Sequence, residues 1–240
     1  MFHVKTNSRD TGWCRPPVHF DSAWPRWVKL LMCAVFLAVA FVLDKPIALW
    51  AYHHPIVFKS DINLEMTMLM QWGQWTCSVL VILAVALLDK QGRRKAVALT
   101  VACLCTVAIC YLTKGLCGRA RPWLLEKGVY GFFGPAYGFL RGATYQSFPS
   151  AHASGAFALA AGLSWFYPNG RGLFYFLALD TAFQRVVRHA HYPADVTAGA
   201  IMAVLVVRSV LWWNWPGHLI AALPESGQRW IRAELSDGAG

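Results

Sequence analysis

Long apolar stretches constrain this chain more than any other feature of its sequence. The first runs unbroken from Leu30 to Leu43, and five more follow it. A helix needs about 20 residues to cross about 30 Å of hydrocarbon, and each stretch approaches this length if polar residues at its ends reach the interface. The six predicted spans cover residues 25–43, 66–88, 96–112, 151–167, 172–188 and 194–213.

Composition narrows the class of protein further. Apolar residues make up 57% of the 240 residues and charged residues 14%, against about 45–50% and about 25% in an average soluble domain. This balance argues against a soluble domain, and against disorder, which requires low hydrophobicity. Backbone polar groups in lipid are satisfied within their own helix. We therefore expect an all-α polytopic membrane protein, with six transmembrane helices bundled in residues 25–213 and tails at 1–24 and 214–240.

The basic residues of short loops predict the orientation of these spans. Residues 89–95 (DKQGRRK) hold four basic residues and one acid, and the N-terminal tail is also basic. The positive-inside rule places both in the cytoplasm. Six spans return the C-terminal tail to the same side, and the segments facing outside are then 44–65, 113–150 and 189–193.

The first apolar stretch is expected to be an uncleaved anchor. Ala38, Val39 and Ala40 imitate the cleavage site of a signal peptide. The polar segment before the stretch is long for a signal peptide, however, and more membrane-length stretches follow. The seven cysteines form no C-x-x-C pair, and the five in apolar runs are expected to pack as small hydrophobes.

One outer segment breaks the charge rule. Residues 113–150 contain five basic residues and Glu126 as their only acid, the bases being Lys114, Arg119, Arg121, Lys127 and Arg141. The net charge of +10 by itself fits nucleic acid, anionic lipid or an anionic substrate. Bases gathered on the outer face of a membrane favour an anionic ligand there and not nucleic acid.

Three clusters of polar residues stand at helix ends on this outer side. The first, Lys114 to Pro122, follows the third span; the second, Pro149 to His152, opens the fourth; the third runs from Arg185 to Asp195, between the fifth and sixth. The predicted topology therefore brings all three clusters to one membrane surface.

These residue types suit a phosphate group. Guanidinium and ammonium groups match phosphate oxygens, so Lys114, Arg121 and Arg185 could surround one phosphoryl group. If Ser150 caps the fourth helix, the backbone N–H groups of Ala151 and His152 point outward at the positive end of the helix dipole.

An Asp–His pair is predicted beside that phosphate site. Pro193 fits the first turn of the sixth helix, which places Asp195 in the same turn and His191 just ahead of it. A carboxylate bonded to one ring nitrogen fixes the histidine tautomer and leaves the other nitrogen free to attack.

In order, the clusters read K-x6-R-P, P-S-x-H and R-x5-H-x3-D. This pattern resembles the type 2 phosphatidic acid phosphatase (PAP2) superfamily, whose membrane members are six-helix lipid phosphate phosphatases. The resemblance implies that His191 forms a phosphohistidine, that Asp195 orients it, and that His152 protonates the leaving oxygen and later helps to activate water. It implies phosphoryl-binding roles for Lys114, Arg121, Ser150, the backbone at Ala151, and Arg185, and neither a metal nor a cofactor.

Two positions depart from the family pattern. Ala151 stands where the family usually has Gly, which is harmless if its φ is negative and damaging if it is positive. Gln184 stands where the family usually has Ser, and its amide can still donate a hydrogen bond. We therefore expect altered contacts to phosphate oxygens and a working site.

The resulting hypothesis is a membrane hydrolase that cleaves a phosphate or pyrophosphate monoester of a lipid at the periplasmic face of a bacterial inner membrane. Candidate substrates are phosphatidic acid, phosphatidylglycerol phosphate, undecaprenyl pyrophosphate and the phosphates of lipid A. The sequence leaves open a lipid phosphotransferase and a non-enzymatic transporter, and it leaves the oligomeric state unknown.

Other polar and aromatic residues have plainer interpretations. His53, His54 and His189 are expected to be structural, although His189 is a rival to His191 as nucleophile. Asp180 lies within a predicted span and is expected to pair, with Arg208 as a conceivable partner. The aromatic residues between 130 and 145 fit a lip that holds a lipid chain and an ordinary interfacial belt equally well.

Overall fold

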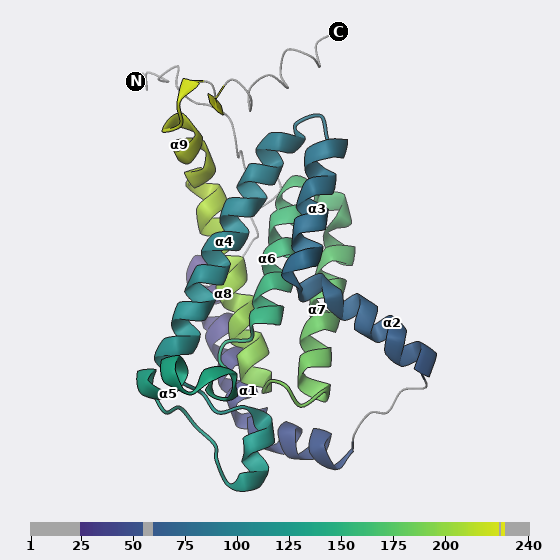
Figure 1. Ribbon diagram of the computed structural model, residues 1–240, viewed down its shortest axis with the longest axis vertical. Coiled ribbons are helices and arrows are strands. Elements are labelled where there is room, and N and C mark those ends of the chain that lie inside the picture. The colour runs from purple at the N-terminus through teal and green to yellow at the C-terminus, as the bar shows by residue number, and fades with distance from the viewer. Residues whose placement is uncertain (1–24, 55–59, 226, 229–240) are drawn as a thin grey trace.

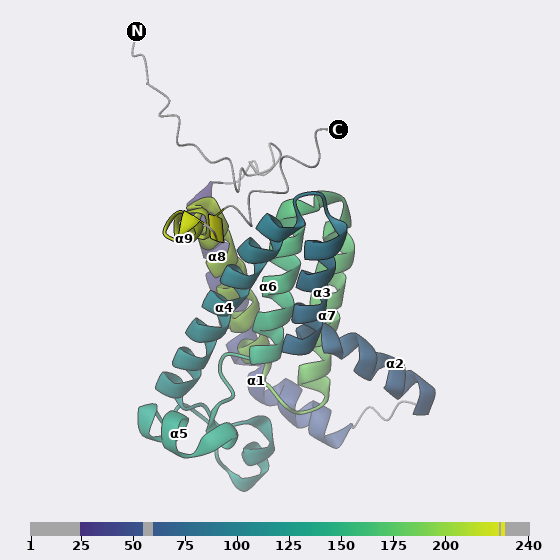
Figure 2. The ribbon, with the colours of Figure 1, turned by 45° about the horizontal axis from the view of Figure 1, so that its top comes forward.

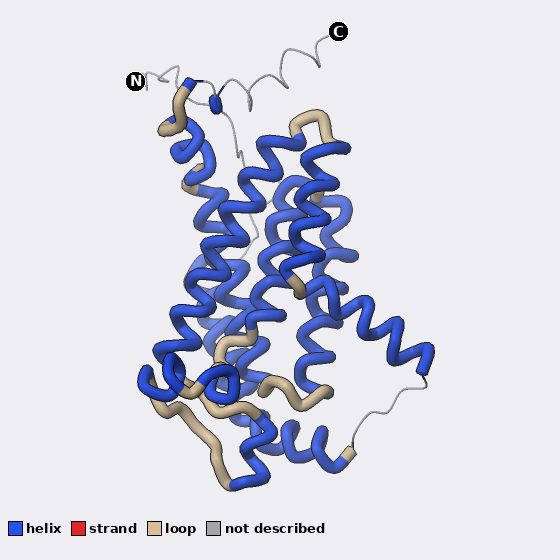
Figure 3. The backbone as a smooth tube through the Cα atoms, in the orientation of Figure 1, coloured by secondary structure: helices blue, strands red, loops and turns tan. Residues whose placement is uncertain are grey.

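The computed structural model describes residues 25–54, 60–225 and 227–228 of the chain, so the predicted tail 1–24 and residues 229–240 of the predicted C-terminal tail lie outside it. Its described residues form helices and loops without a β-strand (Figure 3). The predicted all-α fold is therefore confirmed for this part of the chain. The α-helices are α1 (Arg26–His53), α2 (Ser60–Met70), α3 (Trp75–Leu88), α4 (Gly92–Cys117), α5 (Pro135–Leu140), α6 (Ala151–Phe166), α7 (Arg171–Val187), α8 (Pro193–Trp212) and α9 (Trp215–Ala221), and the 3₁₀ turns are η1 (Gln71–Gly73), η2 (Pro122–Lys127), η3 (Gly142–Tyr145) and η4 (Pro168–Gly170).

Three of the described helices, α1, α4 and α8, are long and apolar enough to cross a membrane. A fourth crossing is present if α2 and α3, which together pass the same test, count as one broken span. Helices α6 and α7 have 16 and 17 residues and are about 24 and about 26 Å long. Six crossings remain a prediction, because three or four are supported by length and composition.

The stretch 66–88, predicted as one span, is broken in the structure. The axes of its two parts differ by 69°, and α2 projects sideways from the bundle in both ribbon views (Figures 1 and 2). The break occurs at Gln74, whose backbone is extended, directly after the buried Gly73. A Cβ on Gly73 would lie 2.6 Å from the carbonyl oxygen of His152. This turn therefore fits tightly against the start of α6.

Helix α6 forms the centre of the bundle and packs against α4, α7 and α8. Its sequence is rich in Ala, Gly and Ser, and twelve of its residues are buried. Small residues let neighbouring backbones approach closely. For example, a Cβ on Gly199 of α8 would lie 2.9 Å from the carbonyl oxygen of Ser150. The start of α6 therefore packs closely against α8.

The outside of the bundle is apolar. No residue of α3 is buried, although its sequence is almost wholly hydrophobic, and large apolar side chains of α1, α4 and α7 are exposed as well. In water such a surface would be unfavourable, whereas in lipid it is the expected exterior.

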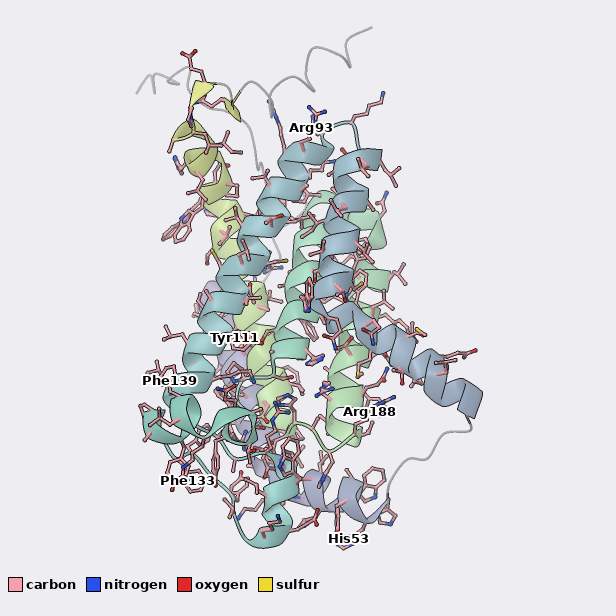
Figure 4. The ribbon with its side chains drawn as sticks, in the orientation of Figure 1. His53, Arg93, Tyr111, Phe133, Phe139 and Arg188 are labelled. Atoms are coloured by element: carbon pink, nitrogen blue, oxygen red, sulfur yellow. The ribbon has the colours of Figure 1, made fainter. Side chains whose placement is uncertain are left out.

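The two ends of the bundle differ. The turn between α3 and α4 and helix α9 lie at one end, and α5 lies at the other (Figures 1 and 2). Figure 4 shows Arg93 at the first end, and Phe133, Phe139 and His53 at the second. The structure therefore separates the basic loop 89–95 from the segment 113–150, as the predicted topology requires, while the side of the membrane on which each lies stays a prediction.

Candidate active site

The first predicted cluster begins where α4 ends. Gly118 terminates the helix with φ +57°, a left-handed conformation that glycine adopts without strain. One turn earlier, the buried Lys114 donates from Nζ to the carbonyl oxygen of Gln146 at 2.5 Å. Arg121 donates from Nε to the carbonyl oxygen of Ala143 at 2.8 Å. The loop 118–150 thus folds back over the end of α4 and fixes both cations.

Ser150 caps α6, as predicted. Its Oγ accepts a hydrogen bond from the N–H of Ala153 at 3.5 Å, and its own N–H donates to the carbonyl oxygen of Asp195 at 2.9 Å. Ala151 is the first residue of α6. Among the described residues other than glycine, positive φ angles occur at His189 and Asn214 and not at Ala151. The methyl group of Ala151 therefore causes no backbone strain.

Asp195 is fully buried and accepts three hydrogen bonds. Its Oδ1 accepts from Nη1 of Arg119 at 2.6 Å. Its Oδ2 accepts from Oγ of Ser147 at 2.5 Å and from the N–H of Tyr192 at 2.9 Å. Nδ1 of His191 lies 3.5 Å from the same Oδ2. The predicted Asp–His pair is therefore present, with Nδ1 toward the carboxylate.

The surroundings of His191 favour its neutral form. Burial lowers its pKa to about 3, with the positive charges of Lys114 and Arg121 acting in the same direction and Asp195 opposing them. The pKa of Arg121 is lowered as well, also chiefly by burial, but an arginine remains charged. A neutral ring whose Nδ1–H faces Asp195 carries its lone pair on Nε2, which is the form that a nucleophile requires.

The remaining predicted residues complete one constellation. Lys114, Arg121 and Arg185 all lie close enough for their charges to act on His152. Arg185 contacts Sδ of Met70 through Nη1 at 3.7 Å, and its buried Nε has no hydrogen-bond partner among the described residues. Nη1 of Arg121 donates to the carbonyl oxygen of Ala190 at 3.3 Å, beside His191. The three predicted clusters thus meet, with donor capacity left for an anion.

Four residues of this site were not predicted from the sequence. They are Asp44 and Arg119, which form a buried ion pair, Ser147, and Gln74, whose Nε2 lies 2.9 Å from Nε2 of His152. Asp44 carried a usable signal, because an acid beside a long apolar stretch is costly unless it is paired. Arg119 was one of the five basic residues in the segment 113–150 that depart from the positive-inside rule. Gln74 carried no such signal, because its partner lies 78 residues away.

The expectations for His189 and Gln184 can also be compared with the structure. Nε2 of His189 lies 2.8 Å from the carbonyl oxygen of Ala48, and its ring stacks on Tyr52. The rival to His191 is therefore held against α1. Gln184, the second departure from the family pattern, donates from Nε2 to Oδ2 of Asp180 at 2.6 Å. This contact turns one amide hydrogen of Gln184 toward the carboxylate of Asp180.

Comparison with known proteins identifies the family of this chain. The family model of the PAP2 superfamily matches residues 95–218, more than half of the chain. The chain belongs to the PAP2 superfamily. All eight residues predicted for the site fall inside the matched range, whereas Asp44 and Gln74 fall outside it.

Two curated relatives share a shorter part of this PAP2 chain. A lipid A 1-phosphatase of Rhizobium etli is 37% identical over 89 residues, which is 37% of this chain and 37% of the relative. A lipid A 1-phosphatase of Rhizobium johnstonii is 38% identical over 88 residues, which is 37% of this chain and 35% of the relative. The aligned parts thus span little more than a third of the relatives' length. No solved structure matches the chain.

Proposed function

We propose that this PAP2 protein is a membrane phosphatase that hydrolyses a phosphate or pyrophosphate monoester of a lipid. One observation carries the proposal. Lys114, Arg121 and Arg185 converge on two histidines, one of which is paired with a buried carboxylate. Three fixed cations can stabilise the negative charge of a phosphoryl group, and a neutral imidazole can attack phosphorus.

The reaction follows from the positions of these groups. Nε2 of His191 attacks phosphorus, and the bond from phosphorus to the lipid oxygen breaks. His152 supplies the proton that the leaving oxygen takes up. A water molecule then attacks the phosphohistidine, gives its proton to His152, and releases inorganic phosphate, which regenerates the free imidazole. Throughout, Asp195 holds Nδ1–H and stabilises the positive charge that develops on the ring.

The phosphoryl oxygens are held without a metal ion in this proposal. Lys114, Arg121 and the unpartnered Nε of Arg185 supply positive charge and hydrogen-bond donors. The start of α6 adds the free backbone N–H groups of Ala151 and His152 and the positive end of the helix dipole. These donors stabilise the charge that spreads over the three equatorial oxygens in the transition state.

The proposed substrate is a lipid because the site lies among helices with an apolar exterior. The relatives are named lipid A 1-phosphatases, so a phosphate of lipid A is the first candidate. Phosphatidic acid, phosphatidylglycerol phosphate and undecaprenyl pyrophosphate offer the same group and remain to be compared. We place six crossings in a bacterial inner membrane, with the site on the periplasmic side.

The proposal is tested by phosphate release from these four lipids with purified protein in detergent. His191→Ala should abolish turnover, and Asp195→Asn should lower kcat by about 10³-fold or more, as removal of an orienting carboxylate does in other histidine-dependent sites. His189→Ala is the matched control, and it should retain most activity because its ring faces Ala48. Chelation of divalent cations should leave the rate unchanged.

Each alternative gives a different result. Equal phosphate release by wild type, His191→Ala and Asp195→Asn would rule out the mechanism. Loss of activity on chelation, with recovery when a metal is added, would rule out the metal-independent assignment. Transfer of phosphate to an added acceptor lipid in place of release would identify a phosphotransferase.

A further inference from the structure

A buried chain of charges connects helix α1 to the catalytic centre. The guanidinium of Arg119 lies between two carboxylates, donating from Nη1 to Asp195 and from Nη2 to Asp44. All three side chains are fully buried. Asp44 also accepts a hydrogen bond from the N–H of Ala194 at 2.8 Å, in the first turn of α8. The chain Asp44–Arg119–Asp195 thus joins α1, the loop after α4, and α8.

Aromatic rings enclose this guanidinium. Five rings lie with their centroids 4.5 to 5.9 Å from Cζ of Arg119, from Phe41, Tyr130, Phe132, Phe148 and Tyr192. Rings at this distance exclude water and attract the cation through their faces. In such a setting a charge is costly unless it is paired and hydrogen-bonded. Arg119 therefore has little freedom to leave either carboxylate.

Arg119 is separate from the phosphate-binding cations. Its exposed fraction is 0%, and two of its nitrogens are committed to carboxylates. Arg185, by contrast, is only partly buried, and its charge acts directly on His152. A guanidinium that has no exposed surface and is paired with two carboxylates is not placed to bind a phosphoryl oxygen, so an effect of Arg119 on the reaction is expected to pass through Asp195.

We propose that Arg119 and Asp44 are positioning residues for the proposed phosphatase reaction, acting through the carboxylate of Asp195. The fork of Arg119 fixes Oδ1, which leaves Oδ2 turned toward Ser147, the N–H of Tyr192 and the ring of His191. Asp44 anchors the other half of the fork and the first turn of α8 at once. The orientation of the nucleophile is thus set partly by helix α1.

This inference rests on the proposed function and is tested on the full-length protein in the same phosphate-release assay. Arg119→Lys keeps the charge but loses the planar fork that spans both carboxylates. It should lower kcat by about tenfold or more, because small misplacements of reacting groups cost up to about 10²-fold, and leave KM within about twofold. Asp44→Asn keeps the shape of the side chain and should lower kcat less, again without a change in KM.

The deciding measurement combines Arg119→Lys with Asp195→Asn. If Arg119 acts through Asp195, the lysine substitution causes no further loss once Asp195 has been replaced. Radiolabelled lipid phosphate keeps the weak turnover of Asp195→Asn measurable. Lys45→Met is the matched control. Nζ of Lys45 lies 4.6 Å from the centroid of the Tyr130 ring, which is one of the five rings around Arg119, but Lys45 is not part of the chain Asp44–Arg119–Asp195. The substitution should leave kcat unchanged.

The same loss of kcat from Arg119→Lys in both backgrounds, or a rise in KM as the main effect, would overturn the positioning role. Wild-type protein that releases no phosphate from any lipid would instead contradict the proposed function. Size-exclusion elution and apparent Tm show whether Arg119→Lys and Asp44→Asn are folded before each variant is assayed.

Discussion

At the scale of single residues, the protonation of His191 links the proposed chemistry to stability. The pKa of His191 is about 3 in the folded protein, because of burial first and of Lys114 and Arg121 next, and about 6.5 in an unfolded chain. Below pH 6.5 the imidazole of His191 binds a proton in the unfolded chain but not in the folded chain. The contribution of a neutral His191 to stability is therefore fully present above pH 6.5 and is lost as the pH falls toward 3.

We predict a loss of about 2 kcal/mol at pH 5 from this residue alone. The apparent Tm of the purified protein, followed by tryptophan fluorescence at pH 7.5 and pH 5, measures the loss. His191→Asn cannot titrate in this range, so its Tm should fall less over the same interval while all other groups titrate as before. Equal falls for both proteins would show that His191 is not held neutral.

Ala151 tests how far the family pattern matters at a single position. The family usually has Gly there, yet this chain has a helical residue with no positive φ. We predict that Ala151→Gly changes kcat by less than about twofold and lowers stability by at most about 1 kcal/mol, the helix-propensity cost of Gly relative to Ala. Phosphate release and apparent Tm check both. A large gain in kcat would mean that the methyl group obstructs the phosphate.

At the scale of elements, the break between α2 and α3 places Gln74 against the side chain that we propose as the proton donor. Gln74 stands at the break and contacts His152, and the neighbouring Gly73 leaves no room for a side chain. A Cβ on Gly73 would lie 2.6 Å from the carbonyl oxygen of His152 and 2.7 Å from Cγ2 of Thr181. We predict that Gly73→Ala displaces this turn and lowers kcat by about tenfold or more, since overpacking costs about 1–3 kcal/mol.

Gly172→Ala is the control for this prediction. A Cβ at Gly172 meets no atom within 4 Å, and Ala is the better helix former in α7. Its kcat should equal that of the wild type. Full activity of Gly73→Ala, with Gly172→Ala also active, would show that the turn is free to move without disturbing His152.

The elements also show what apolar patterning can predict. The spans predicted at 151–167, 172–188 and 194–213 differ from α6, α7 and α8 by one residue at most at either end. The stretch 66–88 was predicted as one span from its length and apolar character, and it contains Gln71, Gly73 and Gln74. Their effect depends on the fit of Gly73 against α6, which is a contact between distant segments and leaves no mark in local hydropathy.

At the scale of the whole molecule, the arrangement in the membrane can be tested by labelling from one side. Lys127 and Gln91 are both exposed and lie in the two regions that the fold separates. We predict that a membrane-impermeant maleimide labels Lys127→Cys in intact spheroplasts and labels Gln91→Cys only after permeabilisation. The wild type, with its own seven cysteines, gives the background. The opposite pattern would place the site on the cytoplasmic side.

The site as a whole was predictable to the extent that its residues form spaced motifs. Lys114, His152 and His191 were found from spacing and predicted topology, and the fold brings their clusters together. Arg119, Ser147 and Gln74 were not found, because each acts by holding another side chain. Supporting contacts of this kind depend on three-dimensional packing, so their absence from a sequence interpretation is expected.

Helix α1 lies outside residues 95–218, the range that matches the superfamily, yet its Asp44 is one of the two carboxylates that pair with Arg119. A fragment trimmed to the matched range would leave that guanidinium beside one carboxylate and would remove Phe41 from the rings around it. The range matched by sequence similarity therefore omits a carboxylate and an aromatic ring that contact Arg119. On the proposed positioning role of Asp44, α1 belongs with the matched range in any expressed fragment or transplanted site.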